Sequence, residues 1–253
     1  SGGELVRKFG TAESIFSEDP EMLFRAGEIT SGVCKKLKDV SDARAKTIAA
    51  ACRNFGWTVV TPQSEFFPDE FKRISDFPLT LYVSGDPSLL KAEYKAGIVG
   101  TRAPDDISLE SAYTLAAGLS ADGITVVSGG ALGIDGAAHE GALTGRGSTV
   151  CVLGNGLGND YLPERVFLKR RIEKFGLLVT EMSPFEPPTK FTFPKRNRLI
   201  AALSKTVTVI QSKQKGGSMI TAPGSRRAAD LRFGRFPDIR NVFPRRLIEE
   251  PCK

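Results

Sequence analysis

From Trp57 onward, short apolar runs alternate with glycine-bearing turns and helical stretches, and this alternation limits the fold more than any other feature. Runs that are almost entirely apolar are typical of strands buried on both faces of a sheet. We therefore predict an α/β fold over residues 56–253, with a mainly parallel sheet and helices on both faces. The predicted strands are 58–61, 79–83, 97–99, 124–127, 149–153, 177–181 and 206–210, and the predicted helices are 108–121, 136–143, 163–175 and 196–203.

The first 55 residues show a different pattern and are predicted to be helical. Asp19 and Pro20 provide an N-cap followed by proline at the first helical position. Apolar residues recur at helical spacing between Ser41 and Phe55, and Gly56 is placed to end that helix. We predict a small helical domain of the SAM or helix-hairpin-helix type over residues 1–55. It could be a docking or nucleic-acid module, or a plain cap on the main domain.

The chain carries a formal net charge of +6 and has a pI near 9.2. Such a charge favours an anionic partner, although many soluble proteins have a similar pI without that function. The four cysteines are scattered and there is one histidine, so the ligand cluster of a zinc site is not expected. No apolar run approaches the ~18 residues of a membrane span. We expect a cytoplasmic protein with neither metal nor membrane partner.

Two glycine-rich turns follow predicted strands, at the edge of a parallel sheet where ligands bind. Backbone N–H groups in such turns can face a phosphate, and an arginine adds a forked cation. The glycines could equally serve tight packing of helix against strand. Neither turn has the GxGxxG fingerprint, so no dinucleotide cofactor is expected. The candidate residues are Gly100, Thr101, Arg102, Ser128, Gly129 and Gly130.

The stretch 193–204 places three cations at the start of a predicted amphipathic helix. Positive charge there opposes the helix dipole, and a bound polyanion would relieve that conflict. Phe191 and Phe193 offer rings on which bases can stack, unless they are buried. A last glycine turn follows the final strand and adds N–H groups and a hydroxyl. We predict that the cations lie with Arg102 at one sheet edge. The candidates are Phe193, Lys195, Arg196, Asn197, Arg198, Gly217 and Ser218.

Asp135 and His139 lie four residues apart, on one face of a predicted helix. They could form an acid/base pair, but neither a nucleophile nor a metal cluster accompanies them. A helix-capping role for Asp135 is the more common arrangement. We therefore expect no catalytic residues.

Taken in order, these motifs resemble the DNA-processing protein A family, also called DprA or Smf. The resemblance rests on IVGTRAP at 98–104, SGGALGID at 128–135, VLGNGL at 152–157, FPKRNRLIAALS at 193–204 and GGSMITA at 216–222. It implies an extended Rossmann-like domain preceded by a helical domain. It also implies a mediator that binds and protects single-stranded DNA, helps to load the RecA recombinase during natural transformation, and forms a homodimer.

The sequence departs from the family pattern at several places. Leu132 stands where the family usually has arginine, and Gln211 replaces the usual acidic residue after the last strand. After Ala222 the family's ending is recognisable only in fragments, which leaves the final strand and its surface in question.

Two other functions remain open. One is a nucleotide-processing enzyme related to lysine-decarboxylase-like phosphoribohydrolases, whose PGGxGTxxE element carries a catalytic glutamate. The comparable stretch here, 216–221, is followed by no glutamate. The other is an inert structural paralogue.

Overall fold

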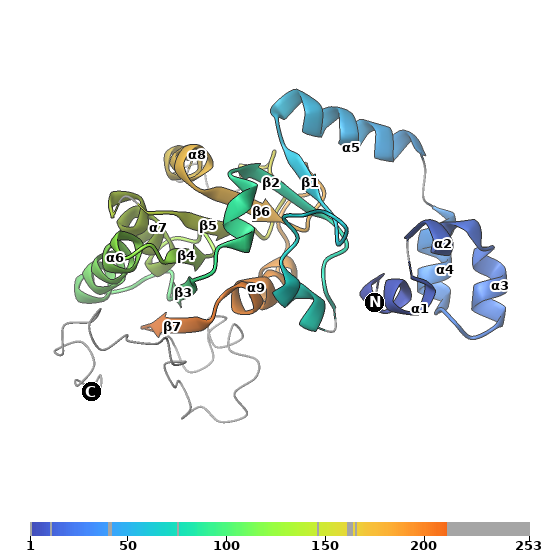
Figure 1. Ribbon diagram of the computed structural model, residues 1–253, viewed down its shortest axis with the longest axis horizontal. Helices are drawn as coiled ribbons and strands as arrows, with labels where there is room; N and C mark the ends of the chain where they lie inside the picture. The colour runs from blue at the N-terminus through green and yellow to red at the C-terminus, as the bar shows by residue number, and fades with distance from the viewer. Residues whose placement is uncertain are drawn as a thin grey trace.

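The computed structural model describes residues 2–10, 12–39, 42–74, 76–145, 147–160, 164 and 166–211. Within these ranges the chain forms a seven-stranded sheet surrounded by helices, with a separate group of short helices at the N-terminus (Figure 1). The strands are β1 (Thr58–Val60), β2 (Leu81–Gly85), β3 (Lys95–Gly100), β4 (Thr125–Ser128), β5 (Thr149–Val152), β6 (Leu177–Thr180) and β7 (Thr206–Ile210).

The sheet has the strand order β1-β2-β6-β5-β4-β3-β7. The five strands from β6 to β7 pair in parallel, whereas β2 pairs antiparallel with both β1 and β6. The predicted α/β class with a mainly parallel sheet is confirmed. The antiparallel edge was not predicted, because an apolar run carries no information about strand direction.

Helices cover both faces of the sheet. Along each strand, side chains alternate between the faces. Ile98 and Val126 pack against α6 (Asp106–Ala121) and α7 (Ile134–Thr144), which lie side by side (Figure 1). Further along this face, Cys151 and Leu178 pack against α8 (Val166–Phe175). The neighbouring strand residues face the opposite layer, formed by α9 (Thr192–Leu203), η1 (Asp69–Arg73) and η2 (Pro87–Lys91).

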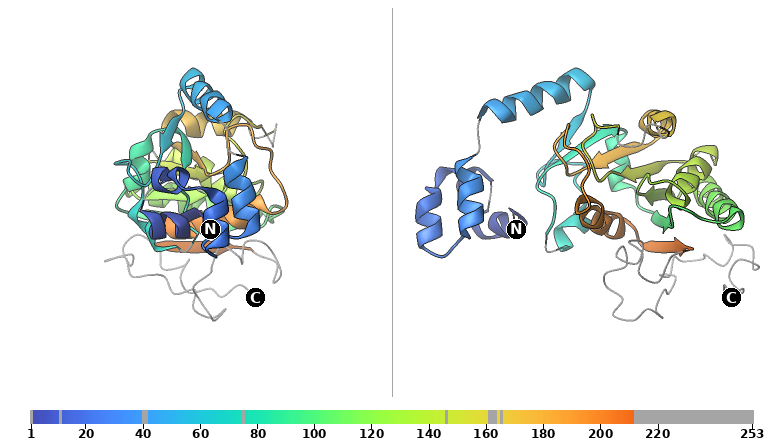
Figure 2. Two further views of the ribbon diagram at one scale, coloured as in Figure 1. Left: turned by 90° about the vertical axis from the view of Figure 1, so that its right-hand side faces the viewer. Right: turned by 180° about the vertical axis from the view of Figure 1, so that it is seen from behind.

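The N-terminal helices form a small cluster of their own. Leu23, Ile29 and Cys34 are its buried centre. The longest of these helices, α5, leads from the cluster to β1 (Figure 2). Its end at Phe55 agrees with the helix expected there, while the division into domains at residues 55 and 56 stays a prediction. The helices are α1 (Gly2–Phe9), α2 (Ala12–Ser17), α3 (Pro20–Arg25), α4 (Ser31–Lys38) and α5 (Asp42–Phe55).

Helix α9 begins four residues earlier than expected, at Thr192 rather than at residue 196. Pro194 therefore lies inside the first turn, where its missing N–H has no helical partner to lose. The consequence for the cations is direct, because Lys195 and Arg196 lie beyond the first three helical residues rather than at the helix start.

Candidate nucleic-acid interface

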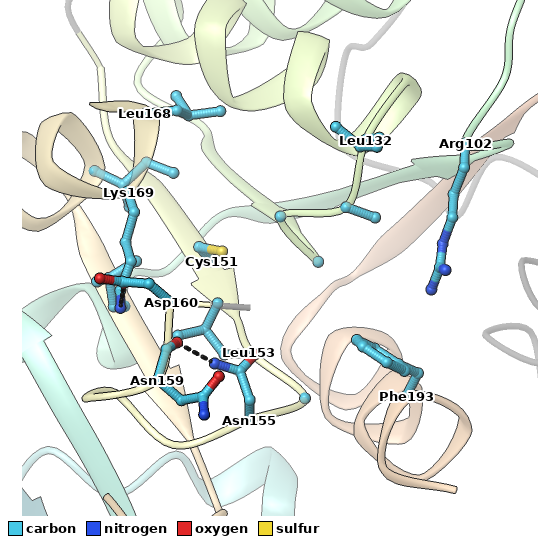
Figure 3. Close-up of a pocket in the computed structure, with 16 residues that line it drawn as sticks. Arg102, Leu132, Cys151, Leu153, Asn155, Asn159, Asp160, Leu168, Lys169 and Phe193 are labelled. Atoms are coloured by element: carbon cyan, nitrogen blue, oxygen red, sulfur yellow. Dashed lines mark hydrogen bonds and ion pairs between the residues drawn. The ribbon is translucent and has the colours of Figure 1, made fainter. Parts of the chain in front are cut away.

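The carboxyl ends of β3, β4 and β5 open onto a cavity of about 140 Å³ (Figure 3). Its floor is apolar and includes Leu153, Leu168 and Ile172. Its polar lining comes from the loops after the strands and from α8. These lining residues include Arg102, Gly129, Gly130, Asn155, Asn159, Asp160 and Lys169. The parallel order of these strands is what brings loops from distant parts of the sequence to one edge.

Arg102 and Phe193 meet at this cavity. The Arg102 guanidinium lies 5.1 Å from the centre of the Phe193 ring, within the range of a cation–π contact. Arg102 is exposed and Phe193 is partly buried. In Figure 3 both side chains lie on the same side of the cavity. The pair therefore offers a charged donor and an aromatic surface next to each other.

Arg196 is placed differently from the exposed cation that the sequence suggested. Its side chain is buried, with 4% of its surface accessible. Nη1 donates to the carbonyl of Gly129 at 2.6 Å and to that of Val152, and Nε donates to Asn197 Oδ1 at 3.1 Å. Asn197 itself is partly buried. Arg196 thus ties α9 to the ends of β4 and β5 from inside.

Asp135 is the buried acidic counterpart of Arg196. Its carboxylate accepts the backbone N–H groups of Gly100, Gly129 and Ala131. Burial raises the pKa of Asp135, while Arg196 and these N–H groups act in the opposite direction. Three donors and a guanidinium give the carboxylate the partners that a buried charge requires.

His139 has partners of its own, one turn further along α7. Nδ1 lies 2.8 Å from the hydroxyl of Thr149, and that hydroxyl donates to the carbonyl of Val126. The histidine therefore donates from Nδ1. Asp135 and His139 share a helix, yet each is held by a different set of bonds.

Arg198 and Lys195 approach an acidic side chain, Glu181. Arg198 Nη2 lies 2.6 Å from Glu181 Oε2, and Lys195 Nζ lies 3.8 Å from the same oxygen. Asp76 is 3.6 Å from Arg198 as well. The side chain of Glu181 is buried, and that of Lys195 is half exposed. Part of the positive charge expected at this edge is therefore neutralised within the chain.

The glycine turns fit closely around these side chains. A Cβ on Gly129 would lie within 2.6 Å of Arg196 Nη1, Arg196 Nη2 and Asp135 Oδ2. Gly130 has a φ of +68°, which favours glycine. Ser128 is buried and donates to the carbonyl of Ile98. At this turn, tight packing is the reason for glycine that the structure shows.

Of the remaining candidate residues, Thr101 lies in the described part of the chain and Gly217 and Ser218 do not. Thr101 is partly buried, and its N–H donates to the carbonyl of Gln211. The side chain of Gln211 bonds both the N–H and the carboxylate of Asp105, which fixes the turn that carries Arg102. The assignment of all these residues to DNA stays a prediction.

Residues 58–230 match the family model of DNA recombination-mediator protein A. The chain belongs to this family. DNA processing protein DprA of Bacillus subtilis is 37% identical over 175 residues, which are 69% of this chain and 59% of that protein. Protein Smf of Escherichia coli is 35% identical over 165 residues, which are 65% of this chain and 44% of that protein. The chain thus spans about half the length of these relatives.

Two solved members of the DprA family share the fold. The structure of DprA from Streptococcus pneumoniae aligns with a TM-score of 0.64 at 30% identity, over 80% of this chain and 75% of that one. DNA processing protein A from Helicobacter pylori aligns with a TM-score of 0.61 at 35% identity, over 66% and 74% respectively. The Helicobacter pylori structure is described as giving insights into the single-stranded DNA binding mode of that protein. The Rossmann-like fold implied by the resemblance is therefore confirmed.

Some residues of this DprA-type edge were not singled out from the sequence. Glu181 follows β6 directly, but it was counted as part of the strand. A polar residue directly after a buried strand lies at the sheet edge where ligands bind, and this position could have identified Glu181 as a site residue. Lys169 lines the cavity from α8 and donates to the carbonyl of Leu157 and to Asp160. The sequence does not indicate this role, because a lysine in an amphipathic helix is most often on its solvent face.

Proposed function

We propose that this protein binds single-stranded DNA at the carboxyl edge of its sheet. The observation that carries the proposal is the contact of Arg102 with Phe193 at the cavity. An exposed guanidinium can bond a phosphate in forked geometry, and an adjoining ring can stack on a base. Such a site contacts the backbone and one face of a base, so it reads little sequence.

Family membership supports this proposal. The DprA of Helicobacter pylori is described as binding single-stranded DNA, and it shares 35% of its residues with the aligned part of this chain. The site residues of this chain lie inside the segment that matches the family model. Single strands are favoured over duplexes because only an unpaired base exposes its face to Phe193.

We also propose that the bound DNA is not chemically altered. Asp135 and His139, the acid/base pair that the sequence offered, are both buried and held by internal partners. In the part of the chain that the structure describes, no three His, Cys, Asp or Glu residues group as metal ligands would. Release of free base from AMP, abolished by Asp135→Asn, would instead favour the phosphoribohydrolase alternative.

The decisive experiment measures binding of a labelled dT20 oligomer and of the matching duplex by fluorescence anisotropy, across a salt series. The single strand should bind more tightly. Arg102→Ala should weaken binding and flatten the log–log salt dependence by about 0.7, the value of one phosphate contact on a single strand. Phe193→Ala should weaken binding with an unchanged slope, because stacking releases no counterion.

Lys174 provides the control for this experiment. It is an exposed cation near the end of α8, remote from the carboxyl ends of the strands because α8 runs back along the sheet. Lys174→Ala should leave the affinity and slope close to those of the parent protein. Equal binding by the parent and by the folded Arg102→Ala/Phe193→Ala variant would show that the site has been assigned to the wrong residues.

Partnership is a further part of the proposal. The family resemblance supports a homodimer and a role in loading RecA during natural transformation. Light scattering at micromolar protein tests the first point, since a mass near 27.3 kDa at every concentration excludes a dimer. The second predicts faster RecA filament assembly on strands coated by a single-strand-binding protein, and an unchanged rate would contradict it.

A further inference from the structure

Three aromatic rings, two of them close in sequence and the third distant, form a cluster beside the sheet. Phe55 lies at the end of α5, Trp57 lies just before β1, and Phe185 lies in the loop after β6. The Phe55 and Trp57 rings are stacked, with centres 4.7 Å apart and planes at 15°. Phe185 meets Phe55 edge-on, with ring centres 6.2 Å apart, and lies tilted against Trp57, with ring centres 6.0 Å apart. We call Phe55, Trp57 and Phe185 the aromatic platform.

The aromatic platform is open to solvent. Phe55 is 60% exposed and Phe185 is 54% exposed, while Trp57 is partly buried beneath them. Single exposed apolar residues are normal on protein surfaces, but contiguous ones mark binding sites. The platform is rigid on its inner side, because Trp57 packs against the cluster that contains Cys151, Leu157 and Leu178.

One short loop joins this platform to the proposed DNA site. The loop after β5 touches Phe193 at one end, since a Cβ on Gly154 would lie 2.9 Å from that ring. At its other end, a Cβ on Gly158 would lie 2.6 Å from Phe185 and 3.1 Å from Trp57. The four residue steps between these glycines reach no more than roughly 14 Å. The same loop supplies Asn155 and Asn159 to the cavity (Figure 3).

We infer that the aromatic platform is a second base-stacking surface for the same DNA strand. This inference rests on the proposed function, which it extends from one binding point to a track. Continuity with the cavity decides the occupant, because a strand whose phosphate meets Arg102 passes the 154–158 loop within a few nucleotides. Aromatic rings spaced along a groove accept bases of any sequence, because every base has a flat face. The track runs from Phe193, over that loop, to Phe185 and Phe55.

The test compares oligomers of two lengths, dT2 and dT20, on the full chain. The double variant Phe55→Ala/Phe185→Ala removes the exposed rings and leaves Trp57 in place. It should lose about tenfold in affinity for dT20, since one stacked base contributes about that factor. Its affinity for dT2 should be unchanged, because dT2 is too short to extend from Arg102 and Phe193 to the platform. Phe175→Ala is the matched control, with an equally exposed phenylalanine at the end of α8.

Trp57 gives a second, direct reading, because it is the only tryptophan in the sequence. Binding of dT20 to the parent protein should change its fluorescence, and dT2 should leave it unchanged. Parental affinity of the double variant for dT20 would overturn the inference. So would equal losses for dT2 and dT20, or a smaller mass of the variant in light scattering, which would assign the platform to a second copy of the chain. Failure of the parent protein to bind either oligomer would instead overturn the proposed function.

Discussion

Arg196 and Asp135 converge on the backbone of Gly129, within 2.6 Å of where a Cβ would lie. Both side chains are buried, and both bond main-chain groups at or just after the carboxyl ends of β3, β4 and β5. The basic residue that first suggested a DNA contact is therefore part of the frame that holds these turns together. Among the residues that the structure describes, Arg102 is the exposed cation that lines the cavity.

Gly129→Ala should destabilise the protein. The added methyl group has no room, because the atoms that it meets are held by bonds on their other sides. Overpacking of this kind costs about 1 to 3 kcal/mol in the free energy of unfolding. Urea denaturation followed by circular dichroism measures it. Gly118→Ala is the control, since Gly118 lies in α6 with open space around its Cβ position. That change should raise stability by about 0.5 to 1 kcal/mol; stability losses of the same size in both variants would contradict the packing argument.

Arg196→Met should lower the free energy of unfolding by about 3 to 5 kcal/mol. The change leaves Asp135 buried without its countercharge and the carbonyls of Gly129 and Val152 without their donor. Adding Asp135→Asn should recover part of the loss, which a double-mutant cycle in urea would detect. By contrast, Arg102→Ala should change stability by less than about 1 kcal/mol, because Arg102 is exposed.

A change in DNA binding without a change in stability would instead indicate that Arg196 contacts DNA directly. If Arg196→Met kept the stability of the parent but flattened the salt dependence of dT20 binding, its guanidinium would have to reach the phosphates. The two effects are measured separately, so a folding defect cannot be mistaken for a binding defect.

Much of the fold could be predicted from the sequence, whereas the inward placement of the cations was missed. Apolar runs between glycine turns located each strand. Residue type suggested an exposed Arg196, since arginine is rarely buried unless paired. The helical spacing of apolar residues, by contrast, predicts a buried Arg196. Arg196 precedes Leu199, Ile200 and Leu203 by three, four and seven residues, so it shares their buried face. Its partner Asp135 could not be identified before the sheet order brought the carboxyl ends of β3, β4 and β5 together, with α7 on one face and α9 on the other.

Leu132→Arg should strengthen binding of single-stranded DNA. Leu132 occupies the position where the family usually has arginine, and it lines the same cavity as Arg102 (Figure 3). A second cation there should add one phosphate contact and steepen the log–log salt slope by about 0.7. Phe175→Arg adds the same charge at the far end of α8 and should leave the slope nearly unchanged. Equal gains from both variants would mean that net charge, rather than the cavity, governs binding.

Cys151 should make stability fall as the pH rises above about 9. Burial raises the pKa of this thiol to about 12, because the thiolate would lie in an apolar wall. Between the ordinary pKa of 9.0 and that raised value, the unfolded chain loses the proton and the folded chain keeps it. The unfolded state is thereby favoured, by up to about 1.4 kcal/mol per pH unit. Below pH 9 both states are protonated, so the group has no effect on the pH dependence.

The measurement is urea denaturation at several pH values between 8 and about 11, on the parent and on Cys151→Ala. Cys52 contributes to the same trend, because burial also raises the pKa of its thiol. The difference in slope between the two proteins therefore isolates Cys151. The alanine variant should be less stable at pH 8, where it lacks the buried sulfur, and should lose less stability on going to high pH. Parallel curves would show that the Cys151 thiol ionises equally well in the folded chain, which would place it in contact with water from the cavity.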